Sequence, residues 1–121
     1  MKTSYTLVAA LAVVTLTACG ADGDYEACVE FRDAYDDVLQ LEARDAPVDE
    51  GRRAFGTMED RLSEVTNEVR DEELLQDLVE VRRGARHVSQ NRGEMVDIWD
   101  YLELLEDLDL RCEMEFDAEV P

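Results

Sequence analysis

The spacing of apolar residues predicts helices along nearly the whole chain. From position 24 to 44, apolar side chains recur every three or four residues, which places them on one face of an amphipathic helix. This stripe consists of Tyr25, Cys28, Phe31, Tyr35, Val38 and Leu39. Pro47 separates this helix from the next, because the residue before a proline is pushed out of the helical region, while proline itself fits a first turn.

The next two segments show the same periodicity. A helix over 47–67 is predicted. Its apolar stripe consists of Val48, Phe55, Met58, Leu62, Val65 and Val69, the last of which lies just beyond the predicted end of the helix. A third helix begins near Asp71, a residue type that caps helix N-termini. Its apolar positions repeat in a heptad-like pattern at Leu74, Leu78, Val81, Ala85 and Val88. Gly84 weakens this helix by up to about 1 kcal/mol relative to alanine.

The run Asn91-Arg92-Gly93 indicates a break before a final helix that ends near Cys112. This helix is predicted to carry toward the core Met95, Ile98, Trp99, Leu102, Leu105 and Leu108. The pattern leaves open whether the last two segments are two helices or one bent helix. Short connections favour antiparallel neighbours, so we predict an all-α, up-and-down bundle of three to four helices over 25–112, followed by a frayed acidic tail over 113–121.

The N-terminal segment has a different character. Lys2 precedes an apolar run from Leu7 to Leu16, which suits a signal peptide and is shorter than the ~20 residues of a membrane-spanning helix. The sequence Leu16-Thr17-Ala18-Cys19 then resembles the lipobox of bacterial lipoproteins. The resemblance implies cleavage after Ala18 and transfer of a diacylglycerol lipid to the Cys19 thiol. An ordinary secretory signal peptide or a short buried helix is the alternative.

The lipobox resemblance implies where the signal peptide ends and where in the cell the protein is located. Residues 1–18 are the expected signal peptide and residues 19–24 a flexible, lipidated tether. Two acyl chains on one cysteine anchor a protein stably, so we expect it on the outer face of the bacterial cell membrane. No cofactor is expected beyond this lipid. No later stretch approaches the length of a membrane span.

Two of the three cysteines remain once Cys19 carries the lipid. Outside the cytoplasm, leftover cysteines usually form a disulfide, which predicts a bond between Cys28 and Cys112. Such a bond would close a loop of about 85 residues and, in the chain-entropy model, stabilise the fold by at most roughly 4–5 kcal/mol. The alternative is a pair of buried free thiols.

The charge balance narrows the choice of partners. The chain has 31 acidic residues against 12 Lys+Arg, a net charge of −19, which disfavours binding to nucleic acid. The only lysine, Lys2, lies in the predicted signal peptide. Arginine without lysine is typical of a GC-rich genome, with adaptation to high salt as the alternative. We expect a monomer that contacts the membrane through its lipid and binds an unidentified envelope protein.

The residue inventory argues against an enzyme. The only histidine, His87, would have to meet Ser63 or Ser89 to form a Ser-His-Asp triad. His87 and Ser89 are two residues apart on a predicted helix and so do not face each other. Acidic clusters are present, but none matches a calcium-binding loop, so we predict neither catalytic nor metal-ligating residues.

One segment departs from the acidic background. Between Val81 and Gly93 there is no acidic residue, while the basic side chains there are Arg82, Arg83, Arg86, His87 and Arg92. We refer to these four arginines as the basic island. They are candidates for contact with an acidic partner or a lipid headgroup. The alternative is internal ion pairing with neighbouring helices.

The overall plan resembles the small, acidic, helical lipoproteins of unknown function from actinobacteria and their phages. The matching features are the lipobox, the A-C-x-x-F-x-x-A-Y stretch from Ala27 to Tyr35, and the late Cys112. That group has no shared activity to transfer. We therefore expect a non-catalytic, membrane-anchored interaction or masking module of the cell envelope, with phage superinfection exclusion as one form. An accessory solute- or cation-binding lipoprotein is the alternative.

Overall fold

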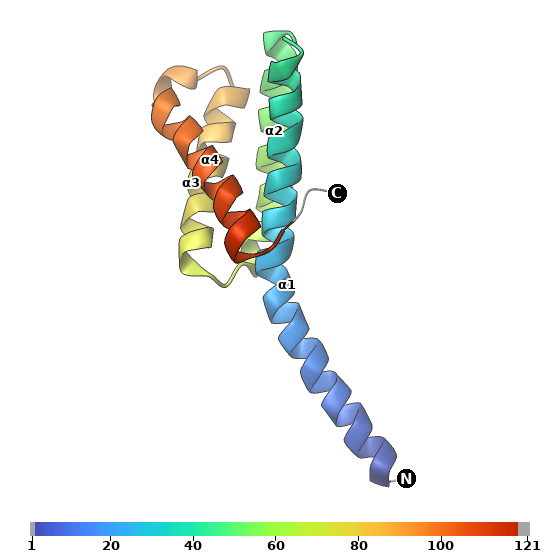
Figure 1. Ribbon diagram of the computed structural model, residues 1–121. Helices are drawn as coiled ribbons and strands as arrows, with labels where there is room; N and C mark the ends of the chain where they lie inside the picture. The colour runs from blue at the N-terminus through green and yellow to red at the C-terminus, as the bar shows by residue number, and fades with distance from the viewer. Residues whose placement is uncertain (1, 119–121) are drawn as a thin grey trace.

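The protein is a bundle of four helices, without a strand between residues 2 and 118. The computed structural model describes the backbone of residues 2–118 and the side chains of residues 23–94 and 96–118. Its helices are α1 (Lys2–Ala43), α2 (Val48–Val65), α3 (Glu72–Ser89) and α4 (Ile98–Glu115). The chain runs up, down, up and down (Figure 1). The predicted all-helical bundle is confirmed, whereas the predicted signal peptide and Cys19 lie outside the residues whose side chains are described.

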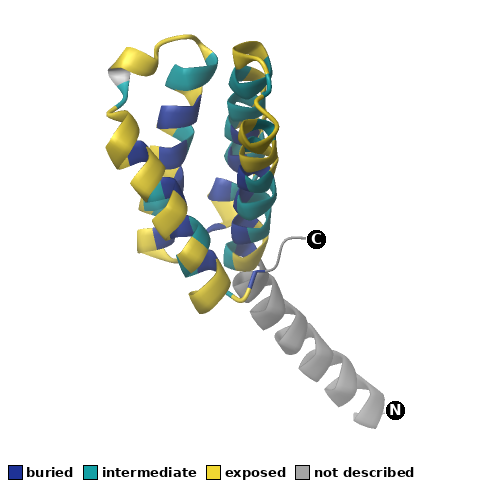
Figure 2. Cartoon of the chain, turned by 45° about the horizontal axis from the view of Figure 1, so that its top comes forward, coloured by how far each residue is buried: buried dark blue, intermediate teal, exposed yellow. Residues whose placement is uncertain are grey.

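The helices surround one apolar core. Helix α2 packs against α1 and α3, and α4 makes smaller interfaces with the same two neighbours. Buried residues line the inner faces of the helices (Figure 2). The largest fully buried apolar side chains, drawn from all four helices, are Phe31, Met58, Leu62, Leu74, Leu78, Leu105 and Leu108. The apolar stripe predicted for α3 is the most accurate, since only Val88 among its five members remains partly exposed.

A disulfide joins the first and last helices. Cys28 on α1 and Cys112 on α4 are both fully buried, and their sulfur atoms lie 2.11 Å apart. The predicted pairing is therefore present, across a sequence separation of 84 residues. It attaches α4 covalently to α1.

The folded domain begins earlier than predicted. The carboxylate of Asp24 accepts hydrogen bonds from the backbone N–H groups of Arg70 (2.7 Å) and Asp71 (3.3 Å), just before α3. Gly23 lies so close to Glu68 that a Cβ at position 23 would approach the Glu68 carbonyl carbon to 3.2 Å. Gly23 and Asp24, predicted to belong to the flexible tether, thus hold the connection between α2 and α3.

The last two segments are separate helices. Helix α3 ends at Ser89, Asn91 adopts a left-handed conformation (φ 57°), and a short 3-10 helix, η2 (Gly93–Met95), follows. Asp97 then caps α4 by accepting a 3.2 Å hydrogen bond from the N–H of Asp100. At the start of α3, Asp71 has the predicted capping role and accepts from Leu74 N–H at 2.9 Å. A second 3-10 helix, η1 (Thr66–Glu68), follows α2.

The residues after Cys112 are not frayed as far as Ala118. Helix α4 continues to Glu115, and Ala118 is fully buried. The N–H of Ala118 donates to the Cys112 carbonyl at 3.1 Å, and its own carbonyl accepts from the Arg32 guanidinium. Arg32 also pairs with Asp109 on α4 at 2.9 Å. The end of α4 is therefore fastened to α1 by polar contacts as well as by the disulfide.

The predicted inward face of α4 is wrong in its first half. Ile98, Trp99 and Leu102 are exposed, whereas Tyr101, which was not assigned to the core, is buried. The side chain of Met95 lies outside the described residues. Leu105 and Leu108 are buried as predicted. The reason is that α4 has apolar residues on more than one face, so periodicity alone does not select the side that meets the core. Outside α4, the stripe members with exposed side chains are Tyr25, Leu39 and Val48.

Candidate functional site

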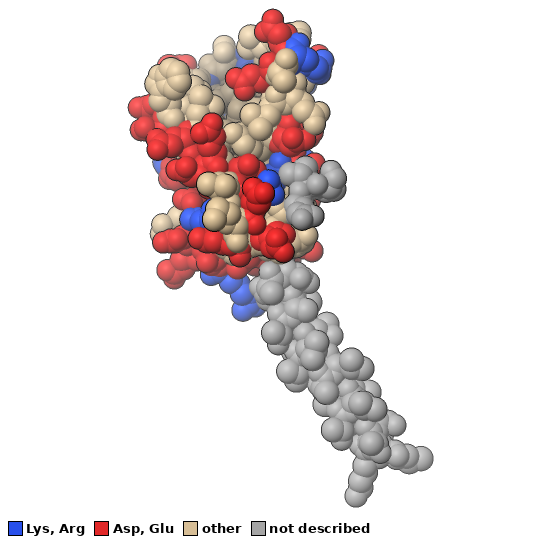
Figure 3. All heavy atoms as spheres, viewed as in Figure 1, with Lys and Arg blue, Asp and Glu red and all other residues tan. Residues whose placement is uncertain are grey.

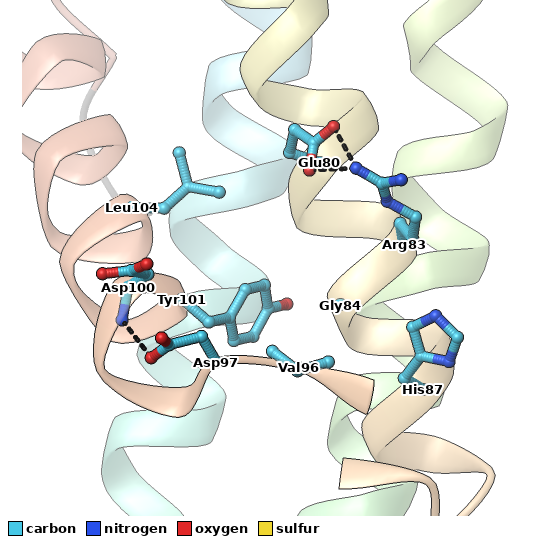
Figure 4. A pocket seen from close by; sticks show the side chains of 9 residues that line it. All are labelled: Glu80, Arg83, Gly84, His87, Val96, Asp97, Asp100, Tyr101 and Leu104. Carbon is cyan, nitrogen blue, oxygen red and sulfur yellow. Dashed lines mark hydrogen bonds and ion pairs between the residues drawn. The ribbon is translucent and has the colours of Figure 1, made fainter. Parts of the chain in front are cut away.

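A groove of about 470 Å³ lies between α3 and α4, near the connection that joins them (Figure 4). Its wall on α3 includes Gly84 and His87, and its wall on α4 includes Tyr101 and Leu104. Val96 contributes from the connecting segment. The aromatic ring and the two aliphatic side chains make the groove partly apolar, which suits a small ligand or a side chain of a partner protein.

Charged residues of opposite sign stand on the two sides of this groove. Arg83 on α3 is paired with Glu80 of the same helix. Asp97 and Asp100 stand at the start of α4, and no ion pair among the described residues joins either of them to Arg83. The α3 side of the groove therefore carries an ion pair, and the α4 side carries carboxylates.

His87 is the one polar side chain of the groove with an unpartnered buried atom. Its Nδ1 atom is shielded from solvent and has no hydrogen-bond partner in the structure. The histidine as a whole is half-exposed, as expected from its helical position. His87 and Val96 both line the groove (Figure 4). His87 therefore lines the groove with part of its ring, while its Nδ1 atom is covered by the protein.

Tyr101 has a structural role in this groove. Its hydroxyl donates a 2.8 Å hydrogen bond to the backbone carbonyl of Val81, deep between the helices. Burial raises the pKa of Tyr101. The hydroxyl is thus occupied and stays protonated at neutral pH, so the residue offers a ligand its ring and not its proton.

The two serines do not form a triad with His87. The hydroxyl of Ser63 donates to the Asp60 carbonyl at 2.8 Å, and that of Ser89 donates to the Arg86 carbonyl at 2.9 Å. Both hydroxyls thus bond to the preceding turn of their own helix. Among the described side chains, no three His, Cys, Asp or Glu residues are grouped so that they could hold a metal ion.

The basic island is largely engaged within the domain. Arg86 pairs with Glu59 of α2 at 2.9 Å, and Arg83 pairs with Glu80. Arg82 donates a 3.1 Å hydrogen bond to the Thr66 hydroxyl. Arg92 donates to the side chain of Gln90. The structure thus favours internal ion pairing for two of the four arginines, and contact of the island with a partner stays a prediction.

The outward side of α4 is a second candidate surface, which the sequence analysis missed. Figure 3 shows uncharged surface interleaved with acidic side chains along the face on which α4 lies. Five apolar side chains of this helix are between 39% and 77% exposed. They are Ile98, Trp99, Leu102, Leu110 and Met114, and we call this set the α4 outer face. The sequence signal was the presence of apolar residues all round the helix.

The charge of the α4 outer face is negative. The exposed carboxylates of Glu103, Glu106 and Asp107 form no ion pair with any described residue. Arg111, the only basic residue of α4, pairs instead with Asp77 of α3 at 2.9 Å. The outer face therefore combines apolar contact area with unneutralised negative charge.

No protein-family model, curated protein or solved structure matches the chain. In the described part of the chain, no helix combines the length and the apolar character that crossing a membrane requires.

Proposed function

We propose that this protein is a non-catalytic interaction module of the bacterial cell envelope, held on the outer face of the cell membrane by a lipid on Cys19. The α4 outer face is the observation that carries this proposal. Exposed apolar side chains are common one at a time, but five on the outward side of one helix are more typical of a surface that a partner covers. Masking of an envelope receptor, as in phage superinfection exclusion, is one form that such a module takes.

The α4 outer face supports this function better than the basic island does. Pairing of Arg83 and Arg86 with Glu80 and Glu59 reduces the positive charge that the island presents to an acidic partner. Trp99, in contrast, is 77% exposed. Tryptophan is enriched among the residues that dominate binding energy at interfaces.

Photo-crosslinking in cells tests the interaction function. A photoreactive phenylalanine analogue at Leu102 or Leu110 should give a discrete crosslinked protein band. The same analogue at Val48, which is equally apolar and more exposed but lies at the start of α2, should not give that band. An identical pattern at Val48, or no crosslink at either α4 position, would contradict the proposal.

The α3–α4 groove favours a second candidate function, that of an accessory solute-binding lipoprotein. The supporting observation is the groove itself, which is lined by His87 together with Arg83 and Asp97. Amino acids carry both an anionic and a cationic group, and charged residues of both signs line the groove. Calorimetric titration of the full chain with amino acids should then give saturable heat that is lost in His87→Ala; absence of such heat would exclude this function.

A further inference from the structure

We infer that the α4 outer face docks a cationic amphipathic helix. This inference rests on the proposed interaction function and specifies the chemistry of the partner. It draws on three features of α4: the row in which its exposed side chains are arranged, the charge between them, and the position of Trp99.

The exposed side chains of α4 follow a row with a spacing of four residues. Positions 98, 102, 106, 110 and 114 are Ile, Leu, Glu, Leu and Met, and all five are exposed. Side chains four residues apart form a ridge on a helix, and such ridges fit into the grooves between the ridges of a second helix. At ~1.5 Å per residue the row extends over roughly 24 Å, enough for several turns of a partner helix. The geometry of the face therefore favours a helical partner.

The negative charge of the α4 outer face indicates that the partner is positively charged. Glu106 interrupts the apolar row, and Glu103 and Asp107 flank it. These three carboxylates are exposed and find no cation among the described residues. A partner with Lys or Arg beside its apolar residues would neutralise them while its apolar side contacts the row.

The same charge disfavours other occupants of this face. A second copy of the chain would bring two sets of the same carboxylates together, and each copy carries a net charge of −19. An anionic bilayer surface would repel the face for the same reason. Helices that lie on membranes carry mainly Lys and Arg on their polar side, whereas α4 carries acids there.

Trp99 supplies a direct measurement of docking, because it is the only tryptophan of the chain. Its side chain is 77% exposed, so covering it should shift its emission to shorter wavelength. The probe is an 18-residue helical peptide of Leu and Lys without aromatic residues. The full chain, in nanodiscs of neutral phosphatidylcholine, should show a saturable blue shift with this peptide. The apparent affinity should fall as salt is added.

Two triple variants, each of which removes three negative charges, make this test specific for α4. In the first, E103Q, E106Q and D107N are combined, and the dissociation constant should rise about tenfold, since each exposed ion pair contributes modestly. In the control, E26Q, E64Q and E72Q remove three exposed acids from α1, α2 and α3. These three also lack an ion pair among the described residues, and their loss should change the constant by less than about twofold.

The controls distinguish docking of a cationic helix from other partners. A peptide with Glu in place of Lys should give no shift. Absence of a saturable shift with the Lys peptide, or equal weakening by both triple variants, would overturn the inference. A stronger shift with anionic vesicles, or dimerisation through α4, would also overturn it.

The crosslinking test keeps this inference separate from the function on which it rests. If crosslinks form at Leu102 and Leu110 while the Lys peptide fails to bind, the interaction function stands and the cationic helix is wrong. If the peptide binds but neither position crosslinks in cells, the proposed function is wrong.

Discussion

Gly84 of α3 lies directly against the phenol ring of Tyr101 of α4. A Cβ built at position 84 would lie 2.7 Å from the Cδ1 and Cζ atoms of that ring and closer still to Cε1. The ring is also held at its far end, because the Tyr101 hydroxyl donates to the Val81 carbonyl. The glycine that weakens α3 as an isolated helix is therefore the residue that lets α4 approach it.

Gly84→Ala should destabilise the protein. Alanine favours the helix by up to about 1 kcal/mol, but its methyl group would overlap a buried ring that has little room to move. We expect a net loss of about 1–3 kcal/mol in the free energy of unfolding, measured by urea denaturation. The matched control is Gly51→Ala in α2, where nothing lies within 4 Å of the added carbon, and a gain of about 0.5–1 kcal/mol is expected. An equal gain in the free energy of unfolding at both positions would show that the Tyr101 ring moves to make room for the methyl group.

Stability should fall in alkaline solution. Burial raises the pKa of Tyr101, whereas in the unfolded chain the group titrates near about 10. Above that pH the unfolded state binds fewer protons than the folded state, so the free energy of unfolding decreases by up to about 1.4 kcal/mol per pH unit. Tyr101→Phe should flatten this decrease and cost about 1 kcal/mol at neutral pH through the lost hydrogen bond.

Part of the alkaline effect should survive in that variant. Burial, with the nearby carboxylates of Glu106 and Asp109, also raises the pKa of Tyr35. Denaturation curves between pH 8 and 11 provide the measurement. Parallel pH profiles for the wild type and Tyr101→Phe would contradict the assignment to Tyr101.

Reduction of the Cys28–Cys112 disulfide should lower the melting temperature by more than about 10 °C. The bond closes a sequence separation of 84 residues, for which loop entropy gives an upper value of roughly 4–5 kcal/mol. About 1 kcal/mol already shifts a domain of this size by several degrees. The variant with both cysteines changed to Ala should melt at the same lowered temperature with or without reductant. Two titratable thiols in the unreduced, denatured protein would contradict the pairing.

Arg86→Glu should destabilise the domain more than Arg92→Glu. Arg86 pairs with Glu59, whose side chain is only 15% exposed, so reversal would leave that carboxylate facing another one. We expect a loss of about 1 kcal/mol, partly restored by added salt through screening. Arg92 is exposed and forms no ion pair among the described residues, so its reversal should change stability by less than about 0.5 kcal/mol. Equal effects would argue that the island does not stabilise the fold through ion pairs.

Cys19→Ala should abolish labelling of the protein by palmitate and leave the precursor uncleaved after Ala18. Cys112→Ala provides the matched control, because it removes a cysteine without touching the lipobox, and it should still be labelled. In membrane fractionation of the same cells, an aberrantly cleaved form of Cys19→Ala should be released, whereas Cys112→Ala should stay with the membrane. Persistent labelling of Cys19→Ala would contradict the lipobox assignment.

Local pattern determined most of the fold. The periodicity of apolar residues predicted four helical segments with ends within a few residues of those observed, apart from the start of α1, because amphipathic spacing, proline and capping residues act over one or two turns. It left open whether the last two segments form one helix or two. The heptad-like stripe of α3 predicted its buried side, since four of its five members are buried, although Val79 on another face of the helix is exposed. The Cys28–Cys112 pairing followed from the expectation that Cys19 carries the lipid, which leaves two cysteines to pair.

Only the tertiary structure decided which side of α4 faces inward, and therefore which side faces a partner. Helix α4 carries apolar residues on both sides, so its own sequence does not distinguish Tyr101 from Trp99 as the core aromatic. Two contacts with distant residues make the choice: Tyr101 fits the space left by Gly84, and Cys112 reaches Cys28. Both are matches of shape or covalent geometry between separate helices, which periodicity along one helix does not encode. They turn Trp99 to the outside and create the surface on which the proposed function rests.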